Sequence, residues 1–235
     1  MSHPAVVGRD EWLRARLELL EEEKQFNRAR DALSAKRREL PRVRVDEAYT
    51  FDSDAGTQSL ADLFGSHSQL IVQHFMFGPG WGEGCKSCSF WSDQFSPAVA
   101  HLNARDVAFA AVSDAPYAEF APFKQRMGWT FHWVSAAACN FSHDYLVHYT
   151  PEDIEAGATF YNYRDGFHYG EHSPGVSVFL RDDDGAIYHT YSCYARGLDM
   201  LNGAYHLLDI VPRGRDEDGL SAKMAWLKLH DQYAD

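Results

Sequence analysis

The chain has 235 residues, 45% of them hydrophobic, which fits one α/β domain with additions or at most two small domains. The formal net charge of −12 argues against partners such as nucleic acid or an acidic membrane surface, and no apolar run approaches the length of a membrane span. With only four cysteines and no apolar core of a secretory signal near the N-terminus, we expect a cytoplasmic protein without a disulfide framework.

The first predicted element is a long charged helix at residues 10–40, which Asp10 caps and Pro41 ends. Its apolar residues recur at spacings of three and four, and they are Trp12, Leu13, Leu17, Leu20, Phe26, Ala29 and Leu33. We interpret residues 1–42 as a helical arm that packs on the body of the protein. A homodimer contact is the alternative, because a single stripe does not identify the surface that it packs against.

Strands and helices alternate through residues 43–212, which we expect to form the main domain. The apolar patterns predict strands at 43–51, 70–77, 106–113, 129–135, 176–180 and 186–191. Helical segments are predicted at 59–64, 89–102, 117–127 and 198–208. This alternation indicates a βαβ architecture with a largely parallel sheet.

Two segments of the second half have weaker patterns. Residues 139–172 are rich in Tyr, Phe and His, and we interpret them as an insertion with a short helix and a strand near Thr159–Tyr163. The insertion could cover an active site or pack as an irregular aromatic layer. Residues 213–235 are predicted to form a polar loop and a last helix from about Leu220.

The most informative stretch is residues 70–92. A buried strand leads into a turn with four glycines at 78–84, and Cys85-Lys86-Ser87-Cys88 then stands where a helix begins. The first turn of a helix has unpaired N–H groups and the positive end of the dipole, and both favour a thiolate. Lys86 adds a cation beside the first cysteine.

Three interpretations of this cysteine pair are open: two unrelated reduced cysteines, half of a structural zinc site, or a dithiol–disulfide couple. A zinc site needs two more ligands at close spacing, and the candidates Cys139, Cys193 and His168-x-x-x-His172 are distant. A strand before the pair and a helix after it favour the dithiol–disulfide couple, so we expect neither a metal nor a cofactor.

The order of these elements resembles the thioredoxin fold. More narrowly, nearly the whole chain is similar to a thioredoxin-like family, formerly of unknown function, whose members are described as predicted dithiol–disulfide oxidoreductases. The segments that carry the similarity are Glu22-Glu23-Lys24-Gln25-Phe26, Arg30-Asp31-Ala32-Leu33, His74-Phe75-Met76-Phe77, Cys85-Lys86-Ser87-Cys88-Ser89-Phe90-Trp91, Arg126-Met127-Gly128-Trp129, Gly175-Val176-Ser177-Val178-Phe179, His189-Thr190-Tyr191-Ser192, Tyr194-Ala195-Arg196-Gly197 and Gly214-Arg215-Asp216-Glu217. The resemblance implies an α/β fold in which helices flank a central mixed sheet, in addition to the N-terminal arm.

The resemblance also implies roles for individual residues. Cys85 would be the attacking thiolate, and Cys88 the resolving thiol. Pro174 falls where the thioredoxin fold carries a cis-proline beside the cysteine pair. A cis Ser173–Pro174 bond would turn backbone groups of Ser173 towards an incoming disulfide. His74 stands where thioredoxins place a buried acid, so it is either a proton acceptor for Cys88 or a hydrogen-bonded core histidine.

The sequence also departs from the patterns of related proteins. Thioredoxins place Trp directly before the first cysteine, whereas Gly84 is adjacent here and Trp81 lies four residues upstream. Peroxiredoxins use Pro-x-x-x-Thr-x-x-Cys, and Gly78 and Gly82 occupy the Pro and Thr positions. A peroxide reductase is therefore the alternative enzyme.

The remaining expectations concern arginines and partners. Arg126 and Arg196 could stabilise a peroxide anion, but surface ion pairs are the expected use of both. The oxidoreductase would act on a protein or small-molecule disulfide and be reduced by a thiol donor that the sequence does not identify. A non-enzymatic scaffold with the thioredoxin fold is the third function class.

Overall fold

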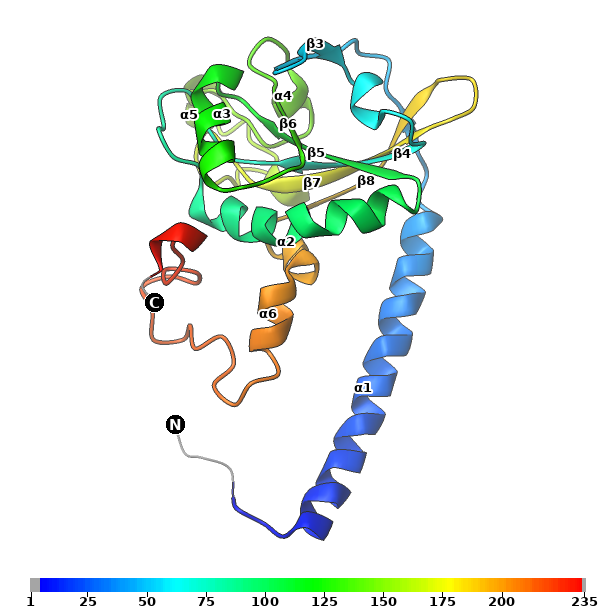
Figure 1. Cartoon of the computed structure of the whole chain (residues 1–235), viewed down its shortest axis with the longest axis vertical. Coiled ribbons are helices and arrows are strands. Elements are labelled where there is room, and N and C mark those ends of the chain that lie inside the picture. Colours follow the sequence, from blue (N-terminus) through cyan, green and yellow to red (C-terminus); the bar gives the residue numbers. More distant parts are fainter. Residues whose placement is uncertain (1–4, 234–235) are drawn as a thin grey trace. The chain divides into compact units, whose positions relative to one another are not determined.

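The computed structural model describes residues 5–233, and the chain divides into two compact units, one that ends at Pro41 and one that begins at Arg42 (Figure 1). The first unit is dominated by helix α1, which runs from Arg9 to Arg38. In the part of the chain that the structure describes, no helix is both long and apolar enough to cross a membrane.

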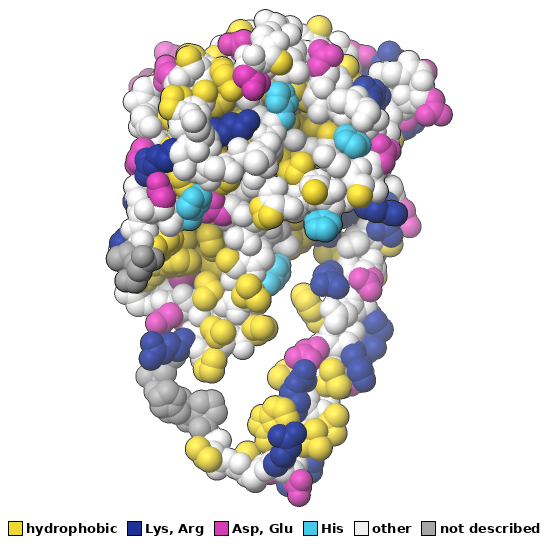
Figure 2. Space-filling view, in the orientation of Figure 1, with side chains coloured by type: hydrophobic (Ala, Val, Ile, Leu, Met, Phe, Trp, Pro, Cys, Tyr) yellow, Lys and Arg dark blue, Asp and Glu magenta, His cyan; other side chains and the backbone are white. Residues whose placement is uncertain are grey.

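Helix α1 follows Gly8, so Asp10 lies in its first turn and does not cap it as predicted. The helix ends just before Pro41, and basic residues in the last turn suit the negative end of its dipole. Large apolar side chains of α1 are exposed, among them Trp12, Leu17 and Phe26. Figure 2 shows hydrophobic side chains mixed with charged ones along the helix. Packing of this apolar stripe on the body of the protein, or in a homodimer contact, stays a prediction.

The second unit is built on one sheet of eight strands among the described residues. Its strands are β1 (Val43–Arg44), β2 (Thr50–Ser53), β3 (Gly56–Ser59), β4 (Gln69–His74), β5 (Val107–Ser113), β6 (His132–Ser135), β7 (Gly175–Arg181) and β8 (Ile187–Tyr194). The strand order is β1-β8-β7-β4-β5-β6-β2-β3. Only the pairs β4–β5 and β5–β6 are parallel. The sheet is therefore mixed, and the expectation of a largely parallel sheet was wrong, because the hairpins β2–β3 and β7–β8 add antiparallel strands on both sides of the parallel ones.

Helices connect the strands or follow the last strand (Figure 1). They are η1 (Asp62–Phe64), α2 (Lys86–Asn103), α3 (Tyr117–Arg126), α4 (Phe141–Asp144), α5 (Pro151–Glu155), η2 (Tyr161–Tyr163), η3 (Ala195–Leu201), α6 (Gly203–Leu208) and η4 (His230–Gln232). The central order β5-β4-β7-β8, with α2 as the crossover between β4 and β5 and with β7–β8 as a hairpin, is the thioredoxin topology. The predicted α/β fold with a mixed sheet is confirmed.

The alternation of side chains along β4 separates two hydrophobic cores. Leu70 and Val72 pack on one face of the sheet with Phe64 and Phe141 from the η1 and α4 segments. Phe75, just after the strand, packs on the other face with residues of α2 and α3. Each fully buried apolar side chain of this size contributes about 1.5–3 kcal/mol, so the two cores fix β4 tightly at the centre of the sheet.

Two predicted elements do not form. The segment near Thr159–Tyr163 is the short helix η2, and the segment from Leu220 is irregular apart from η4. A buried carboxylate organises the C-terminal segment instead: Glu217 accepts hydrogen bonds from the Tyr205 hydroxyl at 2.9 Å and from the Trp226 indole at 2.7 Å. These tertiary contacts replace the helical hydrogen bonds that the sequence pattern predicted.

Candidate active site

The loop between β4 and α2 is folded back against the end of β4. The Cys85 N–H donates to the Met76 carbonyl at 3.1 Å, and the Phe75 N–H donates to Val112 at 2.9 Å. A Cβ atom at Gly84 would lie 2.7 Å from ring atoms of both Phe75 and Phe123. The position directly before the first cysteine therefore has no room for a side chain, which explains glycine where thioredoxins carry Trp.

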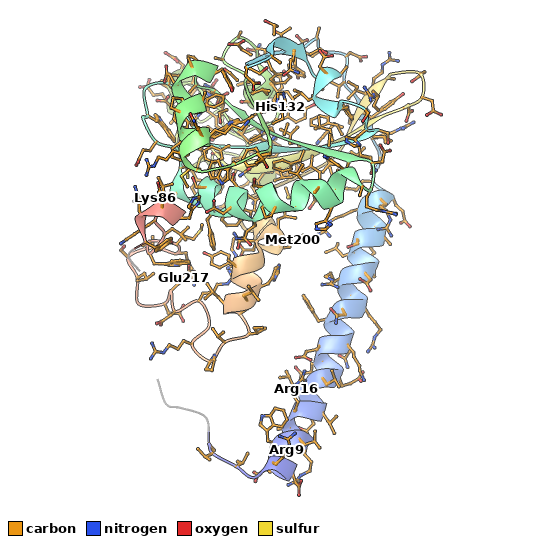
Figure 3. All side chains as sticks on the ribbon, in the orientation of Figure 1. Arg9, Arg16, Lys86, His132, Met200 and Glu217 are labelled. Atoms are coloured by element: carbon orange, nitrogen blue, oxygen red, sulfur yellow. The ribbon has the colours of Figure 1, made fainter. Side chains whose placement is uncertain are left out.

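Helix α2 begins at Lys86, which Figure 3 labels. Cys85 is the residue that precedes its first turn. Both cysteines of the pair are free thiols. Cys85 is half-buried, whereas Cys88 is 3% exposed and its sulfur accepts a hydrogen bond from the Met76 N–H at 3.4 Å. The first cysteine is thus the more accessible of the two.

The two thiols have opposite pKa shifts. A hydrogen bond from the Cys88 thiol lowers the pKa of Cys85 to about 7, and hydrogen bonds from the N–H groups of Ser87 and Cys88 act in the same direction against burial. Burial raises the pKa of Cys88 well above its ordinary value, and the hydrogen bond to Cys85 adds to this shift. Lys86 is exposed, and hydrogen bonds rather than its charge are the main causes of the low Cys85 pKa.

Trp81 lies in the glycine-rich loop that leads to Cys85. Its indole packs edge to face against the ring of His172, with the ring centroids 5.3 Å apart, and it remains 45% exposed. The loop is tied to α3, because the Gly80 N–H donates to the Glu119 carboxylate at 2.6 Å. Trp81 is therefore an exposed aromatic surface on a fixed loop beside the cysteine motif.

His74 does not join the cysteine pair. Its side chain points to the face of the sheet opposite α2, where Nε2 lies 2.8 Å from the Ser177 hydroxyl. Burial lowers the pKa of His74 to about 3, so the ring is neutral. This environment is that of the core histidine, one of the two roles that the sequence left open.

The side chain that does reach Cys88 from β4 is Gln73. Its Nε2 donates to the Cys88 carbonyl at 3.1 Å, and its Oε1 accepts from the Ser92 hydroxyl at 2.8 Å. Gln73 is 3% exposed, so these two bonds hold the first turns of α2 against the strand. Sequence reasoning missed this residue, although a polar side chain within an apolar strand was a visible signal.

The prediction of a cis Ser173–Pro174 bond was wrong, because the described residues contain no cis peptide bond. The backbone before Pro174 pairs with the insertion: the Ser173 N–H donates to Val147 at 2.8 Å, and His172 forms an antiparallel bridge with His148. An extended trans backbone continues this pairing, and Ser173 is 2% exposed. Ser173 therefore does not offer its N–H to a substrate, and the site rests on the cysteine pair.

The arginines named in the sequence analysis form surface ion pairs, as expected. Arg126 pairs with Glu83 and with Asp231, and Arg196 pairs with Asp199 at 3.0 Å. The pair with Glu83 also ties the loop before Cys85 to the end of α3. Both guanidinium groups thus have acidic partners already.

A second polar cluster lies at the carboxyl ends of the parallel strands, and the sequence analysis did not find it. Asp114 follows β5 directly, and its Oδ2 accepts from Nδ1 of His148 at 3.1 Å and from Nδ1 of His172 at 2.9 Å. Although burial acts to raise the pKa of Asp114, hydrogen bonds from both histidines and Ser142 hold it below its usual range. These three side chains could hold a metal ion.

Comparison with solved structures finds partial similarities at low sequence identity. A peroxidoxin (BcpB) from Mycobacterium tuberculosis is 12% identical over 69% of this chain and 93% of its own, with a TM-score of 0.46. A mitochondrial 2-Cys peroxiredoxin from Plasmodium falciparum is 10% identical over 73% and 95%, with a TM-score of 0.43. A thiol:disulfide interchange protein from Bacteroides sp. is 15% identical over 71% and 90%, with a TM-score of 0.38.

Comparison with sequences identifies a family but no individual relative. A search of curated proteins finds no match. The profile of a family described as "Bacterial protein of unknown function (DUF899)" matches residues 1–233, which is nearly the full length of the chain. The chain therefore belongs to the DUF899 family.

Proposed function

We propose that the chain is a thiol–disulfide oxidoreductase with Cys85 as the nucleophile and Cys88 as the resolving thiol. The observation that carries the proposal is the asymmetry of the pair at the start of α2. The more accessible thiol has its pKa lowered to about 7, and the buried thiol has its pKa raised. A thiol with a pKa near the ambient pH combines a large thiolate fraction with high nucleophilicity.

The reaction would proceed through two thiol exchanges. The Cys85 thiolate attacks one sulfur of a substrate disulfide, which forms a mixed disulfide and releases the other substrate sulfur as a thiolate. The Cys88 thiol then loses its proton to that thiolate or to solvent and attacks the Cys85 sulfur. This attack breaks the mixed disulfide and releases the second substrate sulfur as a thiolate. The substrate has then gained two electrons and takes up two protons, one from Cys88 and one from solvent, and the protein keeps a Cys85–Cys88 disulfide that a thiol donor reduces.

The surroundings of the pair suit a protein or small-molecule disulfide better than a peroxide. Gly78 and Gly82 occupy the Pro and Thr positions of the peroxiredoxin motif, and Arg126 is engaged by two carboxylates. Trp81 offers an exposed apolar surface next to the loop, against which a substrate could pack.

Steady-state assays on the full chain test the proposal. We expect the protein to accelerate the reduction of a disulfide-linked peptide by dithiothreitol, without accelerating peroxide consumption by the same donor. Cys85→Ser should abolish the acceleration. Cys88→Ser should accumulate a mixed disulfide between Cys85 and the peptide, which mass spectrometry detects. Cys139→Ser is the matched control, because that half-buried cysteine packs against the other core.

The same assays separate the alternatives. Peroxide consumption that depends on Cys85 would identify a peroxide reductase. A chain that accelerates neither reaction would be a scaffold. Trapping of the peptide on Cys88 in the Cys85→Ser variant would reverse the proposed roles.

A further inference from the structure

We propose that Asp114, His148 and His172 form a binding site for a divalent transition-metal ion, separate from the dithiol. The three residues come from three segments that the fold brings together. Asp114 follows β5, His148 lies between α4 and α5, and His172 lies just before β7. The antiparallel bridge between His148 and His172 sets the two rings side by side, with their centroids 4.8 Å apart.

The geometry of the cluster is close to that of a coordination sphere. Both Nδ1 atoms lie near one carboxylate oxygen of Asp114, at 3.1 Å and 2.9 Å, and one ligand atom from each residue falls within 4.8 Å of the others. With metal–ligand distances of about 2.0–2.1 Å, tetrahedral ligands are roughly 3.3–3.4 Å apart. Binding therefore requires each histidine nitrogen to separate from the Asp114 oxygen by only a few tenths of an ångström, with loss of the bridging protons.

The chemistry of the donors selects the class of ion. Two imidazole nitrogens and one carboxylate oxygen are a donor set of catalytic zinc sites and of non-haem iron(II) sites. Mg²⁺ and Ca²⁺ prefer oxygen ligands, and copper(I) prefers sulfur. Three protein ligands leave at least one coordination position for water or a substrate, which distinguishes this arrangement from a closed structural site.

The surroundings hold the ligands in place. The side chain of His172 is 7% exposed, that of Asp114 is 17% exposed and that of His148 is 30% exposed, so the site is largely buried but reachable. A Cβ atom at Gly78 would approach His172 Nε2 to 2.7 Å and the Trp81 indole nitrogen to 2.6 Å. The absence of a side chain at Gly78 therefore lets the loop close over the histidine.

The position of the cluster is also that of a ligand site. In sheets with parallel strands, ligands bind beyond the carboxyl ends of the strands, and Asp114 lies at that end of β5. The neighbouring strand β4 ends at the same edge and continues into the loop with Trp81 that leads to the cysteine pair. A metal ion here would border the cysteine loop without using either thiol.

Metal titration of the full chain with Cys85→Ser and Cys88→Ser tests the site without competition from the pair. Calorimetry with Zn²⁺ should show one ion bound per chain. In the same background, Asp114→Asn and His148→Gln should each weaken binding at least about tenfold, because even second-shell losses cost 10–100-fold. His230→Gln is the matched control, since His230 pairs with Asp93 at 2.7 Å outside the cluster.

A second measurement on the same background, which lacks the Cys85 and Cys88 thiols, does not depend on the folding of the ligand variants. Co²⁺ should broaden the ring proton signals of His148 and His172 before those of His230, and its absorption spectrum should lack a sulfur-to-cobalt charge-transfer band. Failure to bind Zn²⁺, binding that Asp114→Asn leaves unchanged, or broadening centred on other histidines would each overturn the proposal. Because both cysteines are absent, these results do not depend on the proposed oxidoreductase function.

Discussion

The acidity of Cys85 depends on its neighbours within a single helical turn. Burial opposes the thiolate, and the hydrogen bond from Cys88 is the largest of the effects that favour it. The same bond raises the pKa of Cys88, so one interaction assigns the two roles. Lys86 was expected to stabilise the Cys85 thiolate. Because its side chain is exposed, salt screens the attraction between its charge and the thiolate.

Substitutions of Cys88 test whether its hydrogen bond, rather than its sulfur atom, lowers the pKa of Cys85. Cys88→Ala removes the donor, so the pKa of Cys85 should rise from about 7 towards its ordinary value. Cys88→Ser keeps a hydroxyl donor and should change the pKa less. The thiolate fraction grows as pH passes the pKa, so alkylation of Cys85 should reach half its maximal rate at a higher pH in Cys88→Ala.

Mass spectrometry of the alkylated Cys85 peptide across a pH series measures this midpoint. Lys86→Gln is the control for charge, and its midpoint should stay close to that of the unmodified chain. Equal midpoints for Cys88→Ala and Cys88→Ser, or a larger shift in Lys86→Gln, would contradict the role given to the hydrogen bond.

Among the elements, the strand–loop–helix unit of β4 and α2 determines where the thiols lie. Its loop is fixed at both ends by backbone hydrogen bonds and by aromatic rings packed against Gly84. The apolar run and the glycine cluster made this unit predictable from sequence. The contacts that hold the unit were not predictable, because Gln73 meets α2 and Phe123 meets Gly84 through tertiary packing rather than through local spacing.

Gly84→Ala tests the packing of the loop. The added methyl group would meet the rings of Phe75 and Phe123 at 2.7 Å, and overpacking of a core typically costs about 1–3 kcal/mol. Urea denaturation should therefore show a lower free energy of unfolding. Gly219→Ala is the control, because a Cβ there meets no atom within 4 Å. Equal free energies of unfolding for the two variants would mean that the loop accommodates the added methyl group without loss of stability.

The whole molecule distributes its four cysteines among different environments. Cys88 packs in the core beneath α2, Cys139 packs against the core on the other face of the sheet, and Cys193 lies in β8 within a third cluster. Only Cys85 and Cys88 are close in the chain, and a disulfide between them needs no rearrangement of the sheet.

Long-range features show where sequence reasoning reached its limit. The order of the central strands and helices followed from local patterns and from the family resemblance. The ligands Asp114 and His172, by contrast, are 58 residues apart in sequence and meet only in the folded chain. The hydrogen bond from Ser173 to Val147 likewise joins residues that are distant in sequence, and no local pattern near the proline revealed it.

Disulfide mapping after mild oxidation tests the central claim most directly. The full chain is oxidised with a small excess of a disulfide reagent, digested under acidic conditions and analysed by mass spectrometry before and after treatment with dithiothreitol. We predict one dominant bridge, between Cys85 and Cys88, which forms and disappears reversibly while Cys139 and Cys193 remain thiols. A dominant bridge that includes Cys139 or Cys193, or a Cys85–Cys88 pair that does not oxidise, would contradict the dithiol–disulfide account.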